Sequence, residues 1–236
     1  MASDRADLAQ RLSNAARELQ GVGPQETMDD AVRLAVNNVH GADAAGLSLV
    51  RRRRRVESPA FTEDYVKRSD ELQNDLNEGP CLDAIFREKL VHAPDLTTEG
   101  RWPRWAPRIA EDFGVRSMMC FQLFTNEDTV GALNLYATTP DAFDAVDRDD
   151  GLAFAAHVAV AVAAAQKIEQ LDTAVARRTV IGKALGILME RYDFSDDAAF
   201  AVLSRLSSQS NRRLFEVAEE IVRTRRVGAS EETSPA

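Results

Sequence analysis

Apolar residues recur with helical spacing at the start of the chain and with strand spacing soon afterwards. They return every three or four positions over residues 3–20 and again from Glu26 to Val39, which predicts two amphipathic helices separated by the break GVGP. The next two apolar segments, GADAAGLSLV and VESPAFT, are short and β-type. They flank a run of five arginines, so we expect a hairpin, although no Asn-Gly turn marks it.

The central part of the chain alternates polar stretches with short apolar runs. EDYVKRSDELQNDL is either a polar helix or an irregular segment, and EGPCLDAIFREK predicts a turn and then a helix with Pro80 near its first position. LVHAPDL predicts a brief strand that stops at Pro94, and RWPRWAPRIAEDFG predicts a loop leading into a helix. VRSMMCFQLFT and TVGALNLYAT, on either side of NED, predict a hairpin of two apolar strands.

From Gly151 to Tyr192 the sequence has no proline and consists mainly of helix formers, which predicts one long helix. Its most apolar part is rich in Ala rather than Leu, so we expect a buried or dimer-forming helix rather than a membrane span. Apolar positions alternate in steps of three and four, as in the seam of a coiled-coil dimer, and the alternative is a helix that packs only on its own sheet. The seam consists of Phe154, His157, Ala161, Ala164, Ile168, Leu171 and Val175.

Two shorter helices are predicted after the long one, the first with Ser195 as its N-cap. With the end of the long helix they predict a three-helix unit, in which Met189 fills the core. Gly182 and Gly186 each cost about 1 kcal/mol relative to Ala inside a helix, which suggests the close approach of another helix or of a ligand. The expected core residues are Ile181, Leu185, Leu188, Phe200, Leu203, Leu206, Leu214, Val217 and Ile221.

Composition narrows the class of protein. With 236 residues, 44% of them hydrophobic and 28% charged, the chain has enough apolar residues for a packed core and enough charge for a soluble protein. The net charge of −9 means that any binding to a polyanion must come from a local patch. Cys81 and Cys120 have the spacing of neither a disulfide scaffold nor a metal site, and the first residues lack the apolar core of a secretory signal. We therefore expect a cytoplasmic protein without a bound metal.

Charge is distributed unevenly along the chain. From Ala174 to Arg226 there are ten basic and seven acidic residues, a net of +3, which leaves −12 for the rest of the total of −9. This asymmetry points to the C-terminal helices as the place where a polyanion binds. A solvated helical face is the alternative, and the charge alone does not decide between the two.

The sequence motif is more specific than the charge. ARRTVIGKALGILMERYDFSDDAAFAVLSRLSSQSNRRLFEVAEEIV closely resembles an ANTAR domain, the RNA-binding output module of bacterial transcription antiterminators. The resemblance implies that the module grips paired RNA stem-loops and thereby prevents a terminator hairpin from forming. Side-chain amides, hydroxyls and guanidinium groups are the groups with which proteins bind the bases and phosphates of RNA loops. The expected RNA-binding residues are Arg178, Lys183, Arg205, Ser207, Ser210, Asn211, Arg212 and Arg213. A DNA-binding regulator and a module that only binds another protein are the alternatives.

The order of elements over roughly Gln25 to Gln166 resembles a GAF domain, and NEGPCLDAI looks like the segment common in GAF domains that precede ANTAR modules in actinobacteria. The chain thus resembles a GAF-ANTAR regulator without a receiver domain. The implied fold is α+β, with a GAF-like antiparallel sheet and flanking helices joined by a long helix to the three-helix module. The expected parts are an N-terminal helix (1–24), the GAF-like domain (25–166), the ANTAR-like domain (167–226) and a disordered tail (227–236).

GAF domains often bind a small ligand between the sheet and its covering loops. The residue pattern of cyclic-nucleotide-binding GAF domains is not visible here, and His92 and His157 are more simply core residues than haem ligands, so no cofactor is expected. If there is a pocket for an unknown small molecule, its candidate lining residues are Phe61, Cys81, Trp102, Trp105, Cys120 and Phe124. The alternative is that these residues are ordinary core.

An enzymatic alternative exists because some small GAF proteins reduce free methionine sulfoxide with cysteine nucleophiles. Cys81 stands at an expected helix start, where a thiolate would be stabilised, whereas Cys120 is more simply a small apolar strand residue. The attached RNA-binding module has no place in that scheme, so we expect no enzyme.

The five arginines, Arg51 to Arg55, do not constitute the main binding site in this interpretation. Side chains alternate sides along a strand, so the run is more simply a solvated hairpin tip than a surface facing one partner. An accessory RNA contact and a salt bridge to the partner subunit remain open. The sequence as a whole predicts a homodimeric, membrane-free regulator in which the GAF-like domain controls how two ANTAR-like modules meet tandem stem-loops in nascent transcripts.

Overall fold

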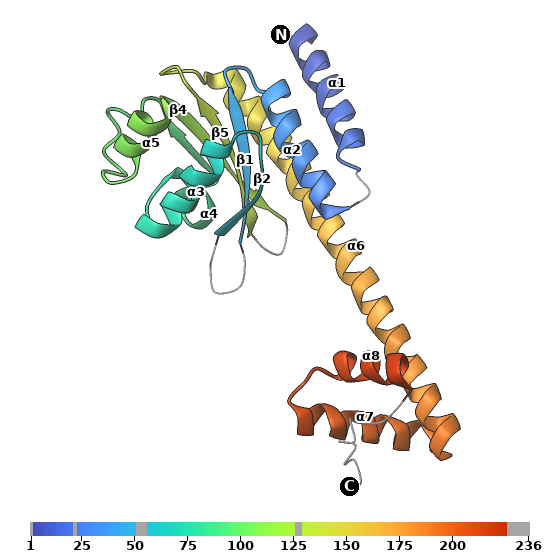
Figure 1. Cartoon of the computed structure of the whole chain (residues 1–236). Coiled ribbons are helices and arrows are strands. Elements are labelled where there is room, and N and C mark those ends of the chain that lie inside the picture. The colour runs from blue at the N-terminus through green and yellow to red at the C-terminus, as the bar shows by residue number, and fades with distance from the viewer. Residues whose placement is uncertain (1, 21–22, 51–55, 126–128, 226–236) are drawn as a thin grey trace. The chain divides into compact units, whose positions relative to one another are not determined.

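A computed structural model describes residues 2–20, 23–50, 56–125 and 129–225. The chain divides into two compact units, Met1–Lys167 and Ile168–Ala236. One helix, α6 (Ala145–Tyr192), contributes residues to both, as Figure 1 shows. The predictions for Arg51 to Arg55 and for the tail lie outside the described residues.

The first unit contains a five-stranded antiparallel sheet. Its strands are β1 (Ala44–Val50), β2 (Val56–Phe61), β3 (Leu90–Ala93), β4 (Ser117–Phe124) and β5 (Thr129–Ala137), in the order β2-β1-β5-β4-β3. The antiparallel pairings of β1 with β2 and of β4 with β5 confirm both predicted hairpins. The long-range pairing of β1 with β5 places residue pairs such as Leu47 and Leu133 opposite one another in the middle of the sheet.

Helices cover both faces of this sheet (Figure 1). One face is covered by α2 (Pro24–Asn38) and the first part of α6, and α1 (Ala2–Glu18) packs against α2 on the side away from the sheet. The other packs against α3 (Asp64–Leu76), α4 (Pro80–Phe86) and α5 (Ala106–Phe113). The polar segment EDYVKRSDELQNDL is thus a helix. It buries Val66 in the second core while its polar residues face outward or meet one another.

Strand β4 shows why the apolar runs are continuous. Met119 and Phe121 belong to the core beneath α2 and α6, whereas Met118 and Cys120 belong to the core beneath α3, α4 and α5. Successive strand side chains point to opposite faces, and here both faces are covered, so polar residues have no exposed face to occupy. The observed α+β architecture matches the predicted fold class.

Helix α6 is buried at its two ends and exposed in its middle. Phe154, Val158 and Val162 pack in the first core, and every side chain from Lys167 to Thr179 is exposed. Phe154 is only 1% exposed, so the prediction that it belongs to the dimer seam is wrong: the sheet already occupies that face of the helix. Among the described residues α6 is long and apolar enough to cross a membrane by length and composition, a test that core helices of soluble proteins also pass.

The second unit consists of the end of α6 with α7 (Asp196–Ser210) and α8 (Leu214–Thr224). Ser195 is the N-cap of α7, as predicted, and its side chain accepts a hydrogen bond from the Ala198 amide. The fully buried core residues are Ala184, Leu188, Ala199, Leu203, Val217, Ala218 and Ile221. Phe200 is 49% exposed and Met189 36% exposed, so both were wrongly predicted as core: the neighbouring small residue Ala199 takes the buried position on α7.

Candidate nucleic-acid interface

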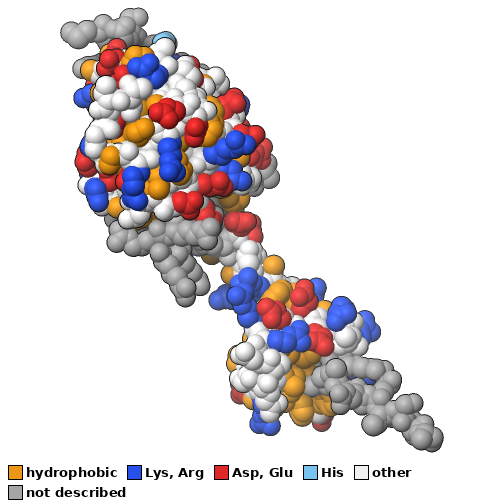
Figure 2. Space-filling view, turned by 60° about the vertical axis from the view of Figure 1, so that its left-hand side comes forward, with side chains coloured by type: hydrophobic (Ala, Val, Ile, Leu, Met, Phe, Trp, Pro, Cys, Tyr) orange, Lys and Arg blue, Asp and Glu red, His pale blue; other side chains and the backbone are white. Residues whose placement is uncertain are grey.

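Three of the predicted RNA-binding residues are exposed cations on two helices. Arg178 and Lys183 lie on α6, and Arg205 lies on α7. No hydrogen bond or ion pair to another described residue involves their side chains. In Figure 2, however, Lys and Arg of the second unit lie among acidic and apolar side chains rather than in one separate basic patch. Net charge alone therefore does not define an interface here.

The predicted hydroxyl and amide residues lie at the end of α7, where the chain turns towards α8. The Ser207 hydroxyl donates to the Arg212 carbonyl oxygen at 2.6 Å, and the Ser210 hydroxyl donates to the Leu206 carbonyl oxygen at 2.7 Å. Asn211 ends α7 with φ of 51°, in the left-handed region that Asn tolerates better than most residues. These side chains thus have a structural role at the end of α7.

Arg212 and Arg213 follow the turn and have different partners. The Arg212 guanidinium donates to the Glu220 carboxylate on α8, and this pairing holds the pKa of Glu220 below its usual value. Arg213 is the N-cap of α8, and its backbone amide donates to the Glu216 carboxylate at 3.3 Å. Both side chains are exposed, but only that of Arg212 is paired with an acid in this way.

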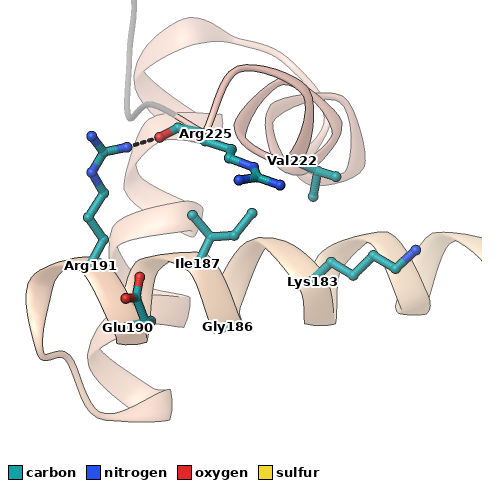
Figure 3. Close-up of a pocket in the computed structure, with 7 residues that line it drawn as sticks. All are labelled: Lys183, Gly186, Ile187, Glu190, Arg191, Val222 and Arg225. Atoms are coloured by element: carbon teal, nitrogen blue, oxygen red, sulfur yellow. Dashed lines mark hydrogen bonds between the residues drawn. The ribbon is translucent and has the colours of Figure 1, made fainter.

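A groove between the end of α6 and the end of α8 brings together residues that the sequence did not connect (Figure 3). It has a volume of about 540 Å³ and is lined by Lys183, Gly186, Ile187, Glu190, Arg191, Val222 and Arg225. The Arg191 guanidinium donates to the carbonyl oxygen of Arg225, the residue that ends α8. Of this set only Lys183 was predicted to bind RNA. Arg191 and Arg225 are 34 positions apart, so no local pattern could pair them.

Gly182 and Gly186 have no neighbour that requires a glycine. Apart from the chain neighbours and the backbone of the same helix, a β-carbon added at either position would meet no described atom within 4 Å. Neither residue therefore serves close packing inside the second unit. The expected approach of another helix or of a ligand is not provided by this unit at either position, and only Gly186 lines the groove.

The six predicted pocket residues of the first unit do not share one environment. Cys81, Trp102, Trp105 and Cys120 are buried in the core beneath α3, α4 and α5, and Phe61 packs partly against it. Phe124 is 48% exposed at the end of β4, with the Lys89 ammonium 4.9 Å from its ring centroid. The four buried residues match the alternative of ordinary core, and their role in ligand binding stays a prediction.

A buried polar network occupies the same core and was not found from the sequence. Asp70, 2% exposed on α3, accepts hydrogen bonds from Ser48 at 2.7 Å, Ser58 at 2.5 Å, Tyr136 at 3.0 Å and Gln73 at 3.1 Å. Burial raises the pKa of Asp70, against the opposing effect of these donors. The network joins β1, β2, β5 and α3, so only the fold brings its members together.

The two cysteines are buried thiols rather than activated nucleophiles. Cys81 does stand at the start of α4, but that helix has only seven residues. Burial, followed by the nearby Asp70 carboxylate, raises the pKa of the Cys81 thiol, and burial also raises that of Cys120. Cys81 is only 1% exposed, so its burial opposes the stabilised thiolate that a helix start would favour. Within the described ranges no group of three or more His, Cys, Asp or Glu residues is placed to hold a metal ion.

The fold defines a protein with an α+β domain followed by a domain of three helices. The GAF domain family model matches residues 21–163 and the ANTAR domain family model matches residues 169–222. The chain therefore belongs to the GAF family and carries a C-terminal ANTAR domain, which is the architecture of a GAF-ANTAR regulator. This architecture is typical of regulators rather than enzymes.

Solved structures resemble the chain in fold. The phytochrome photosensory core module of Stigmatella aurantiaca matches with a TM-score of 0.59 and 12% identity, over 89% of this chain and 46% of that one. The GAF domain of the Acinetobacter phosphoenolpyruvate-protein phosphotransferase matches with a TM-score of 0.53 and 15% identity, over 69% of this chain and 97% of that one. The reduced form of fRMsr of Staphylococcus aureus matches with a TM-score of 0.52 and 16% identity, over 66% of this chain and 94% of that one. A comparison with curated proteins gave no match.

Proposed function

We propose that this protein is a cytoplasmic transcription antitermination regulator that binds RNA stem-loops through its ANTAR domain under control of its GAF domain. The observation that carries the proposal is the ANTAR match over residues 169–222, whose helices expose Arg178, Lys183 and Arg205. Guanidinium and ammonium groups on a rigid helical scaffold suit the phosphates and unstacked bases of an RNA loop. Binding would stabilise the stem-loop and prevent formation of a competing terminator hairpin.

The proposed functional form is a homodimer paired through the middle of α6. Ile168, Leu171 and Val175 are 59%, 54% and 63% exposed, and their spacing places them on one side of the helix. Large apolar side chains aligned in water in this way favour a second copy of the same helix. Ala164 is exposed and would extend this seam, whereas Ala161 packs partly against the core of the first unit.

Dimerisation would give the protein two ANTAR domains for tandem stem-loops. Linking two binding modules makes the second binding event intramolecular, so affinity rises strongly only if both modules can engage at once. A signal received by the GAF domain would act by changing whether the two modules are correctly placed. A small molecule is the expected type of signal.

The direct test measures binding of the full chain to tandem stem-loop RNAs, with a single stem-loop and duplex DNA as competitors. We expect the tandem RNA to bind more tightly than the single stem-loop, duplex DNA to compete poorly, and affinity to fall with salt. Preferential binding of duplex DNA would replace the RNA proposal with a DNA-binding regulator. The reductase alternative has only a fold-level likeness to fRMsr in its favour, and the burial of both cysteines opposes it.

A further inference from the structure

The groove between α6 and α8 has the chemical composition of a nucleotide site. Lys183, Arg191 and Arg225 place three cationic groups around it, against one carboxylate from Glu190. Ile187 and Val222 provide apolar surface between them, and both are only partly buried. In Figure 3 Lys183 and Arg191 project from α6 at opposite ends of the groove, and the Arg225 side chain reaches in from the end of α8.

Gly186 indicates that the groove is kept open. It lies on α6 beside Ile187, and a β-carbon there would find no described atom within 4 Å other than its chain neighbours and the backbone of its own helix. Glycine inside a helix is unfavourable relative to alanine, and folding of this unit gains nothing from its small size. A ligand that passes close to the helix backbone would explain why a side chain is absent at this position.

We propose that this groove holds one unpaired nucleotide of the RNA loop, with the phosphates on either side of it near the cationic side chains and its base against Ile187 and Val222. The inference rests on the proposed RNA-binding function and assigns a part of the domain to a part of the RNA. Glu190 favours a nucleotide over a phosphate alone, because a carboxylate repels a bare anion but accepts a hydrogen bond from a ribose hydroxyl or a base amino group.

The first part of the test is steric. The full chain carrying Gly186→Leu is compared with the wild type for binding a pool of single stem-loop RNAs with randomised loops. A single stem-loop is used because its binding does not require two modules. We expect Gly186→Leu to weaken binding at least ten-fold while raising the thermal stability of the unit. The matched control is Gly182→Leu, one turn earlier and outside the groove lining, which should raise stability equally and retain affinity.

The second part is electrostatic. Lys183→Gln and Arg191→Gln should each weaken binding and lower the slope of log affinity against log salt by about one phosphate contact. Arg108→Gln, an exposed arginine on α5 of the first unit, is the matched control and should change neither quantity.

The outcomes separate this inference from the proposed function. If the wild type binds stem-loops and the groove variants bind as tightly, the groove is not the nucleotide site and the proposed function stands. Equal losses in Gly186→Leu and Gly182→Leu would also reject the groove. If the wild type binds no stem-loop, or prefers duplex DNA, the inference and the proposed function are both wrong.

Discussion

The guanidinium of Arg212 is paired with the carboxylate of Glu220, eight residues further along the chain on helix α8. The pair links the α7–α8 turn to the last helix. It also means that an arginine expected to contact RNA already has an acidic partner. Its two possible roles, holding the turn and binding RNA, predict opposite effects of removing the acid.

We expect Glu220→Gln to strengthen RNA binding several-fold, because the freed Arg212 becomes available to phosphate and a repelling carboxylate is lost. Arg212→Ala should weaken binding by a similar factor. Affinities for a single stem-loop, measured together with thermal unfolding, check both. A drop in affinity and in stability for Glu220→Gln would mean that the pair positions the turn and that Arg212 does not bind RNA.

The Asp70 network predicts a specific pH dependence of stability in the GAF domain. The pKa of Asp70 is raised in the folded protein, so its stabilising contribution is full below the unfolded pKa of about 3.9 and is lost as pH rises through the folded pKa. Asp70→Asn removes this titration. We expect the stability difference, wild type minus variant, to decrease as pH rises above about 4.

Urea unfolding followed by tryptophan fluorescence measures this difference, because both tryptophans of the chain, Trp102 and Trp105, lie in the core that contains Asp70. Taking the difference between wild type and variant cancels the contributions of the other carboxyl groups. A difference that increases with pH would show that the donors around Asp70 stabilise the ionised carboxylate instead.

The buried cysteines predict slow thiol chemistry. Cys81 and Cys120 are 1% and 0% exposed, and both thiols have raised pKa values. At pH 8 we expect a disulfide reagent to modify the folded protein no faster than the domain opens, and to modify two thiols per chain at once in urea. Rapid modification of one thiol in the folded protein, abolished by Cys81→Ser, would restore the reductase alternative.

The dimer proposal predicts that charge in the middle of α6 separates the two copies. Ile168→Asp with Leu171→Asp should give a monomer by sedimentation velocity and lose tight binding to tandem stem-loops, while the GAF core stays folded. Gln170→Asp with Thr173→Asp is the matched control, because these exposed positions add the same charge to the helix away from the seam. Unchanged affinity in a monomeric first variant would reject the role of dimerisation.

Phe154 provides the contrast within the same helix. Its side chain is 1% exposed against the sheet, so Phe154→Ala should destabilise the GAF domain by about 3–5 kcal/mol. Ile168→Ala, at an exposed position of the monomer, should stay within about 0.5 kcal/mol unless a partner helix covers it. Urea unfolding at low protein concentration checks both values. Equal effects of the two changes would mean that the buried and exposed parts of α6 are wrongly assigned.

The sequence predicted strands and long helices well because their signals are local. The runs around Met119 and Leu133 are apolar and β-type, and the stretch from Gly151 to Tyr192 lacks any helix breaker. The core of the ANTAR domain was predicted less well. Phe200 was expected in the core but is 49% exposed, whereas the small residues Ala184, Ala199 and Ala218 are all fully buried where the helices pack closely.

The candidate sites depended on contacts that sequence spacing cannot show. Arg191 and Arg225 meet only because α8 returns to the end of α6, and the donors around Asp70 come from four elements. For the residues at the end of α7, the residue type suggested RNA binding but did not show the hydrogen bonds that the side chains already make. Ser207 and Ser210 have side chains suited to RNA, yet each already donates to a backbone carbonyl. The residue types indicated RNA as a possible ligand, and the structure showed which hydroxyl groups already donate a hydrogen bond within the protein.

The exposed middle of α6 would also report on assembly. Every side chain from Lys167 to Thr179 is exposed, and a helical stretch with so little packing is only marginally stable in water. Its backbone amides should therefore exchange with solvent deuterium much faster in a monomer than those around Val158 or Leu188, which lie in the two cores. Slow exchange in this segment would place a second helix against it, so the local exchange rate measures the occupancy of the seam without any RNA present.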